Sequence, residues 1–124
     1  MGTFRVLIEI GALEAGRLEP VEVLVNTGAT YTFLSRTLLE RLGIRPDEEC
    51  PFVLADGRQL TYPTAWIRVR IDGRAQPTIA VFGDPDTDPL LGAFTLEGFR
   101  LAADQVNRRL VPVPALLKRL GSPA

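Results

Sequence analysis

The chain has 124 residues, 46% of them hydrophobic, and a formal net charge of −1. This length and composition predict one folded domain with a packed core, and they exclude wholesale disorder and a basic surface for nucleic acid. Because histidine is absent and Cys50 is the single cysteine, Ser-His and Cys-His nucleophile pairs, an intramolecular disulfide, and zinc sites built on histidine or several cysteines are excluded as well.

The first part of the chain has the period-two pattern of strands. Over residues 4–10 every second residue is apolar, with Arg5 and Glu9 on the opposite face, and three valines alternate over residues 21–25. Residues 11–20 between these strands are predicted to form a polar turn. Ser35 then has the position of a helix N-cap and Gly43 that of a C-terminal cap, so a short helix is predicted between them.

Two Asp-Gly dipeptides predict tight hairpin turns in the middle of the chain. The first is Asp56-Gly57 and the second is Asp72-Gly73. On both sides of each dipeptide, apolar and β-branched residues have the pattern of strands. The strands are predicted at residues 52–55, 59–62, 65–71 and 78–82.

The last third of the chain combines short helices with a further hairpin. Thr95 is predicted to cap a helical turn over residues 96–99. Strands at 101–104 and 109–113 are predicted to form the hairpin. A terminal helix is predicted over residues 114–120, since proline stands at its first position and glycine follows its last.

These elements together predict a small, mainly β, closed barrel-like domain with one or two short helices. The single domain is expected to span residues 1–124, with a core at about 3–113 and a helical tail at 114–124. We expect a cytoplasmic protein without membrane attachment, because no apolar run is long enough for a membrane span and the N-terminus has no signal core. The unpaired Cys50 suits a reducing compartment.

One segment of the sequence has the pattern of an enzyme active site. Residues 23–30 read Val-Leu-Val-Asn-Thr-Gly-Ala-Thr, and they resemble the active-site segment of retropepsin-like (retroviral-type) aspartic proteases, where two apolar residues precede Asp-Thr-Gly-Ala. Leu90-Leu91-Gly92 is similar to the second signature of that family, and residues 55–58 lie where the family has its substrate-covering flap. Residues 35–43 resemble a short helix of bacterial-type, single-domain members. The resemblance covers about residues 6–113.

The resemblance implies a homodimer with the active site on its two-fold axis, because the motif occurs once in this chain. Asn26 occupies the position of the catalytic aspartate. Thr27 would carry a hydroxyl network between subunits, and Gly28 would allow close backbone approach. The residues implied to bind an extended peptide or protein substrate are Ala29, Ala55, Asp56, Gly57, Arg58 and Leu91. The family mechanism uses neither a metal nor a cofactor.

Asn26 decides how this resemblance translates into activity. An amide has nearly the shape of a carboxylate and can accept and donate hydrogen bonds, but it cannot take up a proton at neutral pH. The leading interpretation is an aspartic endopeptidase, inactive as written because an aspartate was replaced. The alternatives are a natural, non-catalytic peptide-binding module, a domain whose function is dimerisation itself, and an ordinary Asn-Gly-type turn in an unrelated β domain.

The three aspartates at positions 84, 86 and 88 have the alternate spacing that opens a calcium loop. That loop also needs glycine at its sixth position and glutamate at its twelfth, where this chain has Pro89 and Thr95. A solvated acidic loop that could border the cleft is therefore predicted in place of a metal site.

Overall fold

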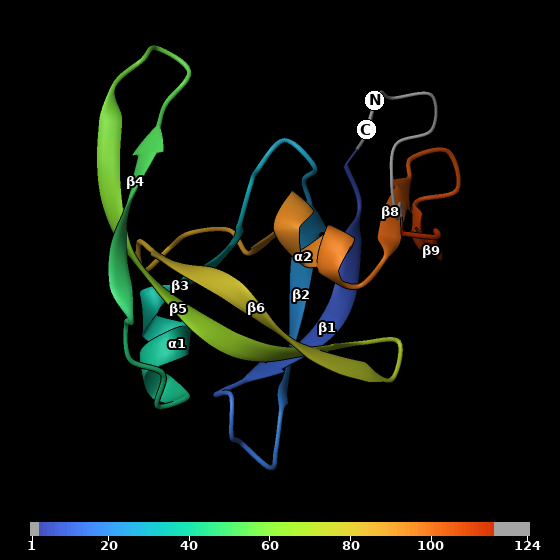
Figure 1. Cartoon of the computed structure of the whole chain (residues 1–124), viewed down its shortest axis with the longest axis horizontal. Helices are drawn as coiled ribbons and strands as arrows, with labels where there is room; N and C mark the ends of the chain where they lie inside the picture. Colours follow the sequence, from blue (N-terminus) through green and yellow to red (C-terminus); the bar gives the residue numbers. More distant parts are fainter. Residues whose placement is uncertain (1–2, 116–124) are drawn as a thin grey trace, which may run out of the picture.

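The computed structural model of the chain describes residues 3–115, which form a mainly β fold with two short helices (Figure 1). The predicted fold class is confirmed. Pro114 and Ala115 are not helical, and the remainder of the predicted terminal helix lies outside the described residues. The elements are β1 (Arg5–Gly11), β2 (Glu19–Val25), β3 (Thr32–Ser35), α1 (Arg36–Arg41), β4 (Glu48–Val53), β5 (Gln59–Ile71), β6 (Arg74–Gly83), β7 (Leu90–Leu91), α2 (Ala93–Gly98), β8 (Leu101–Asp104) and β9 (Arg109–Pro112).

Seven of the strands form one curled sheet in the order β1-β2-β7-β3-β6-β5-β4. Strand β1 also pairs with β5, where Glu9 lies opposite Arg70 and Gly11 opposite Arg68. This additional pairing closes the sheet into a barrel and covers the open edge of β1, so that β4 is left as the edge strand. Strands β8 and β9 form a separate antiparallel hairpin, as predicted.

The hydrophobic core is formed by the apolar residues that alternate with polar ones along the strands. In β5, Ala65, Ile67, Val69 and Ile71 are each at most 3% exposed, whereas Trp66 between them is 44% exposed. The same parity buries alternate residues of β1 and β2. Because a shift of one residue would turn every apolar side chain outward, this pattern fixes the register of the strands.

The two Asp-Gly dipeptides make different turns. Asp72 and Gly73 both have positive φ (52° and 82°), as a two-residue type I′ hairpin requires. At the other dipeptide only Gly57 has positive φ (89°). There, Leu54 accepts the N–H of Gly57 at 2.9 Å and donates its own to the carbonyl of Arg58 at 2.7 Å. The β4–β5 hairpin therefore ends in a three-residue loop with glycine in the left-handed position.

Helix α1 has both of its predicted caps. The Ser35 Oγ accepts a backbone N–H of the first turn at 3.2 Å. At the other end Gly43 has a φ of 79°, and the N–H groups of Gly43 and Ile44 bond to the carbonyls of Glu40 and Leu39, both at 3.0 Å. This pair of bonds satisfies carbonyls that the helix itself leaves free.

The prediction that Thr95 caps a helix is wrong. Helix α2 begins at Ala93, three residues before the predicted start, because the N–H groups of Ala93 and Phe94 donate to the carbonyls of Ala29 and Thr30, both at 2.8 Å. Main-chain carbonyls of a distant loop thus supply the cap that the sequence assigned to a side chain. Thr95 lies inside the helix and is 1% exposed.

Candidate active site

The loop after β2 carries Asn26 where a buried strand reaches the surface. Val25 is 1% exposed, Asn26 is half-buried, and Thr27 and Gly28 are exposed. The Asn26 Oδ1 accepts the N–H of Gly28 at 2.9 Å, and the Asn26 carbonyl accepts the N–H of Ala29 at 3.1 Å. These bonds make a compact turn that holds the Asn26 side chain in one orientation.

Strand β7 supports this loop from below. It lies between β2 and β3, with Leu91 opposite Val25 in parallel register, and the Leu91 carbonyl accepts the N–H of Asn26 at 3.0 Å. Leu91 is 0% exposed, so the structure gives its side chain no surface for direct contact with a ligand. Leu91 instead holds the loop in position through its backbone bond to Asn26. Leu90, which is half-buried, is the more exposed of the two leucines in β7.

Gly92 is the point at which the loop and the start of α2 approach most closely. A Cβ at this position would overlap the carbonyl group of Tyr31 and lie 3.0 Å from the carbonyl oxygen of Ala29. The backbone of Gly92 is extended, with φ −96° and ψ 176°, a conformation open to any residue. Glycine is therefore required here by space and not by backbone angle.

Three buried threonines connect the elements under the loop. The Thr95 Oγ1 of α2 lies 2.6 Å from the Oγ1 of Thr32 in β3 and 2.8 Å from the Oγ1 of Thr78 in β6. The Thr32 Oγ1 also accepts the N–H of Gly92 at 3.2 Å. All three side chains are at most 2% exposed, so each hydroxyl depends on the others for its hydrogen bonds.

Replacing Thr95 by valine is expected to destabilise the fold by about 1–3 kcal/mol, because the variant leaves buried hydroxyls without a partner. Chemical denaturation measures this loss. Thr95→Ser keeps the hydroxyl and should retain most of the stability, which separates the hydrogen bonds from the loss of volume. A Thr95→Val variant as stable as the parent would show that the threonine cluster contributes nothing.

The β4–β5 hairpin and the loop that carries Asn26 project to the same side of the barrel, at the top of Figure 1. The four predicted flap residues at the tip, Ala55, Asp56, Gly57 and Arg58, are all exposed. The Asp56 carboxylate accepts the backbone N–H of Arg58 at 3.0 Å and its Nε at 2.8 Å, and these bonds, the backbone one foremost, lower the pKa of Asp56. The tip is thus internally braced, and in the described part of the chain no hydrogen bond joins it to Asn26.

A line of aromatic rings connects the hairpin to the loop. The Tyr31 ring lies 6.2 Å from that of Phe52 in β4 and 5.7 Å from that of Phe94 in α2. Phe52 is in turn 5.6 Å from Phe33 of β3 and 6.0 Å from Tyr62 of β5. None of the five rings is fully buried, so their edges form an apolar wall between the candidate active-site loop and the hairpin.

A shallow pocket of about 230 Å³ adjoins the same loop. Its walls are the residues from Thr27 to Thr30 on one side and Phe94 and Glu97 of α2 on the other. Of the predicted site residues, Thr27, Gly28 and Ala29 line this pocket, and Asn26 directly precedes them without lining it.

Comparisons with known proteins identify this arrangement. Residues 15–97 match the family described as "gag-polyprotein putative aspartyl protease". The chain belongs to this aspartyl protease family. The matched segment contains every residue that the sequence assigned to the site, from Asn26 to Leu91. No curated protein matches the chain.

Solved viral protease structures have the same fold. The solution structure of the simian foamy virus (mac) protease is 18% identical, with a TM-score of 0.55, and the match covers 77% of this chain and 93% of that chain. The EIAV protease in complex with the inhibitor HBY-793 is 17% identical, with a TM-score of 0.55, and the match covers 86% and 90%. At these identities the similarity establishes the fold alone.

The acidic loop before β7 does not form a metal cluster in this aspartyl protease chain. No group of three or more histidine, cysteine, aspartate or glutamate side chains within residues 3–115 is placed to hold a metal ion. Nor is either helix of the described segment long and apolar enough to cross a membrane.

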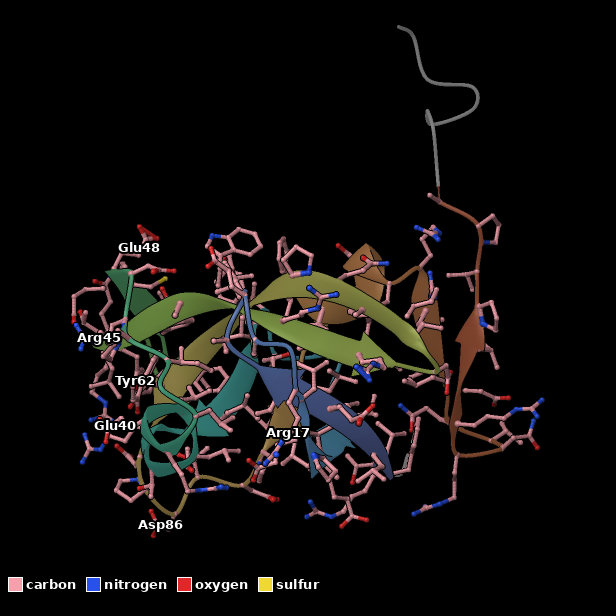
Figure 2. All side chains as sticks on the ribbon, turned by 90° about the horizontal axis from the view of Figure 1, so that it is seen from below. Arg17, Glu40, Arg45, Glu48, Tyr62 and Asp86 are labelled. Carbon is pink, nitrogen blue, oxygen red and sulfur yellow. The ribbon has the colours of Figure 1, made fainter. Side chains whose placement is uncertain are left out.

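The acidic loop is instead tied to the barrel by an ion pair that the sequence did not suggest. The guanidinium of Arg5, at the start of β1, binds both carboxylate oxygens of Asp88, at 3.1 and 3.0 Å. The hydrogen bonds from Arg5 lower the pKa of Asp88 from its ordinary value of 3.8. Asp86 in the same loop projects from the molecule at the lower edge of Figure 2.

A carboxylate with a lowered pKa in the folded state stabilises the fold above the pKa of the unfolded chain, and this contribution is lost as pH falls through the folded-state value. We therefore expect Asp88→Asn to flatten the pH dependence of unfolding below about pH 4. Urea titrations between about pH 7 and pH 2 measure this, with Asp86→Asn as the matched control from the same loop. Parallel curves for the parent and Asp88→Asn would contradict the prediction.

Neither the threonine cluster nor the Arg5–Asp88 ion pair was predicted from the sequence, because each joins positions that are far apart in the chain. The threonine cluster joins positions 32, 78 and 95, which only the topology brings together. The ion pair joins positions 83 apart in the chain. The one available signal for the threonines was their polar character within otherwise apolar strand and helix patterns.

Proposed function

We propose that the chain is one subunit of a homodimeric aspartic endopeptidase of the bacterial, single-domain type, inactive as written because Asn26 stands where catalysis needs aspartate. The observation that carries the proposal is the turn at Asn26. A buried strand delivers one polar side chain to a glycine turn, and β7 and α2 hold that turn from below. The chain contains this turn once, so a complete site needs a second copy across a two-fold axis.

The proposed reaction is attack of a water molecule on a peptide carbonyl between two symmetry-related residues 26. With aspartate at both positions, the pair shares one proton, because two adjacent carboxylates resist simultaneous ionisation. The ionised group takes a proton from the water, and the protonated one donates to the carbonyl oxygen. Thr27 would link the two loops, and Gly28 supplies the N–H that already orients the side chain of residue 26.

Two asparagines in these places could hold the water without taking its proton. We infer that Asn26 replaces a parental aspartate, since the turn, the β7 support and the hairpin are all present around it. The Gly28 N–H that binds Asn26 Oδ1 would bind a carboxylate oxygen equally well. The substitution thus preserves the geometry while removing the acid–base chemistry.

The proposed substrate is an extended peptide with a large apolar side chain close to the cut. The aromatic wall that contains Tyr31 and Phe52 offers ring edges for such a side chain. Ala29 borders the loop, and the exposed tip at residues 55–58 would cover the peptide. Leu91 would act through the loop that it supports. A cytoplasmic location is part of the proposal, because the unpaired Cys50 suits a reducing compartment.

A peptide-binding module without chemistry is the second candidate, and Asn26 is the observation that favours it. If the asparagine is native, the same cleft and hairpin would bind peptides without cutting them. A domain whose function is dimerisation alone would have the same fold, but it would bind no peptide in the cleft.

Restoring the carboxylate separates these candidates. The Asn26→Asp chain is incubated with a diverse peptide pool from mildly acidic to neutral pH, and new peptide termini are identified by mass spectrometry. Endopeptidase function predicts cuts that a peptide isostere with a central hydroxyl suppresses. If a folded, dimeric Asn26→Asp variant binds peptides and leaves them intact, the binding module is the correct function.

A further inference from the structure

The outer face of α2 carries an exposed aromatic ring beside a second one. Thr95 and Leu96 face the core and are at most 3% exposed, whereas Phe94 and Glu97, three positions apart, share the opposite, exposed face. Phe94 is 39% exposed and contacts Trp66 of β5, itself 44% exposed, edge-on with ring centroids 6.1 Å apart. Exposed apolar side chains that adjoin one another, rather than lie singly, indicate a surface that another segment covers.

Two hollows lie along this face and share Glu97 in their walls. The first is the pocket of about 230 Å³ beside the active-site loop, which Phe94 also lines. The second, of about 350 Å³, lies where β8 begins, and its lining consists of Glu97, Arg100, Leu101, Val113, Pro114 and Ala115. We call the surface from Val113 past Glu97 to Phe94 and Trp66 the α2 groove.

Carboxylates border the α2 groove. Glu97 is exposed, and no basic side chain within residues 3–115 forms an ion pair with it. At the far end, the Asp47 carboxylate accepts the backbone N–H of Trp66 at 2.8 Å. Arg100 lies at the opposite end, in the hollow that contains Ala115. The groove therefore suits a segment that combines apolar side chains with positive charge placed beyond its first residues.

The chain itself continues into a segment of this kind. The described residues end at Ala115, in the wall of the second hollow, and residues 116–120 read Leu-Leu-Lys-Arg-Leu. Five residues span about 7 Å as a helix and up to about 17 Å when extended. Side chains three positions apart on α2, such as those of Glu97 and Phe94, are about 5–6 Å apart. Residues 116–120 are thus long enough to run from Ala115 past Glu97 to the two rings.

We propose that residues 116–120 fold back over their own subunit and occupy the α2 groove, with Leu120 against Phe94 and Trp66 and with the two cations beside Glu97. Helix α2 donates its first two N–H groups to carbonyls of the active-site loop. The segment therefore acts as a strap that holds α2, and through it the loop, in place. This goes beyond the proposed function, because the strap would support a peptide-binding module equally well.

The fluorescence of Trp66 tests the strap, because Trp66 is the single tryptophan of the chain. Leu120→Asp replaces the side chain that shields the indole by a charge that avoids apolar rings. Acrylamide quenching should therefore rise roughly twofold as the indole returns to its 44% exposure. Val106→Asp is the matched control, because Val106 is 89% exposed in the β8–β9 turn, and it should quench like the parent.

A charge swap tests the contact with Glu97. Glu97→Lys places like charges side by side, so it should release the strap and raise the quenching of Trp66 as well. Adding Lys118→Glu and Arg119→Glu to that variant should return the quenching to the parent value, which a local effect of the first substitution would not allow. Glu14→Lys makes the same charge change at an exposed position of the β1–β2 loop and should have no effect.

Three results would overturn the strap. One is a folded Leu120→Asp chain that quenches like the parent, and another is a charge swap that restores nothing. The third is shielding of Trp66 that is lost on dilution, because a contact within one subunit does not depend on protein concentration and a contact with a second copy does. Each of these results leaves the endopeptidase standing, since the measurements use the Asn26 chain and no cleavage.

Discussion

Asn26→Asp is expected to change an inert chain into a peptidase, with cleavage at least about 10²-fold faster than that of the Asn26 chain under the same conditions. One positioned acid–base group contributes about 10²–10⁴ in rate, and the substitution restores one in each subunit. The Gly28 N–H, now 2.9 Å from Asn26 Oδ1, orients the new carboxylate without movement of the loop. Initial rates on a peptide from the cleaved pool measure the gain.

The pH profile of the Asn26→Asp enzyme gives a second readout. The mechanism needs one carboxyl protonated and its partner ionised, so the rate should pass through a maximum in the acidic range and fall when both are ionised. Asn26→Ala is the control, since it removes the Oδ1 acceptor as well as the chemistry and should remain inactive at every pH. A rate that rises steadily toward alkaline pH would contradict a shared-proton pair.

The strand pattern of this fold could be predicted from the sequence because most of the core is built by local alternation. Over residues 65–71 the period-two pattern corresponds to the buried face of β5, and the Asp-Gly dipeptides mark both hairpin turns. The caps of α1 at Ser35 and Gly43 were also predictable, because a cap depends on residues within one turn of the helix.

The parts that could not be predicted depend on contacts between distant segments. Strand β7 has two residues and gains its place from β2 and β3, so no periodicity marks it as a strand. Helix α2 starts where carbonyls of the active-site loop cap it, and this overrides the local capping signal of Thr95. The dependence of the loop on Gly92 is likewise invisible in the sequence, which shows a glycine but not the Tyr31 carbonyl against it.

Gly92→Ala is expected to destabilise the protein by about 3 kcal/mol, at the upper end of the range for overpacking a filled site. The added methyl group would overlap the carbonyl of Tyr31, which is main chain and cannot rotate aside as a side-chain terminus can. Relief requires α2 to move away from the loop, and this would weaken the bonds from Ala93 and Phe94 to the loop carbonyls, both 2.8 Å long. For a chain of this length, a drop in Tm of roughly 10 °C corresponds to such a loss.

Gly98→Ala is the matched control, because it makes the same chemical change at the other end of α2. A Cβ at Gly98 meets nothing within 4 Å, and alanine in a helix is favoured over glycine by about 0.5–1 kcal/mol. Calorimetry should therefore show Gly92→Ala melting well below the parent and Gly98→Ala at or slightly above it. In the Asn26→Asp background, Gly92→Ala should also lose activity at temperatures where it is still folded, since moving α2 displaces the turn that orients residue 26. If the two alanine variants melted together, the close approach at Gly92 would not be what holds the active-site loop in place.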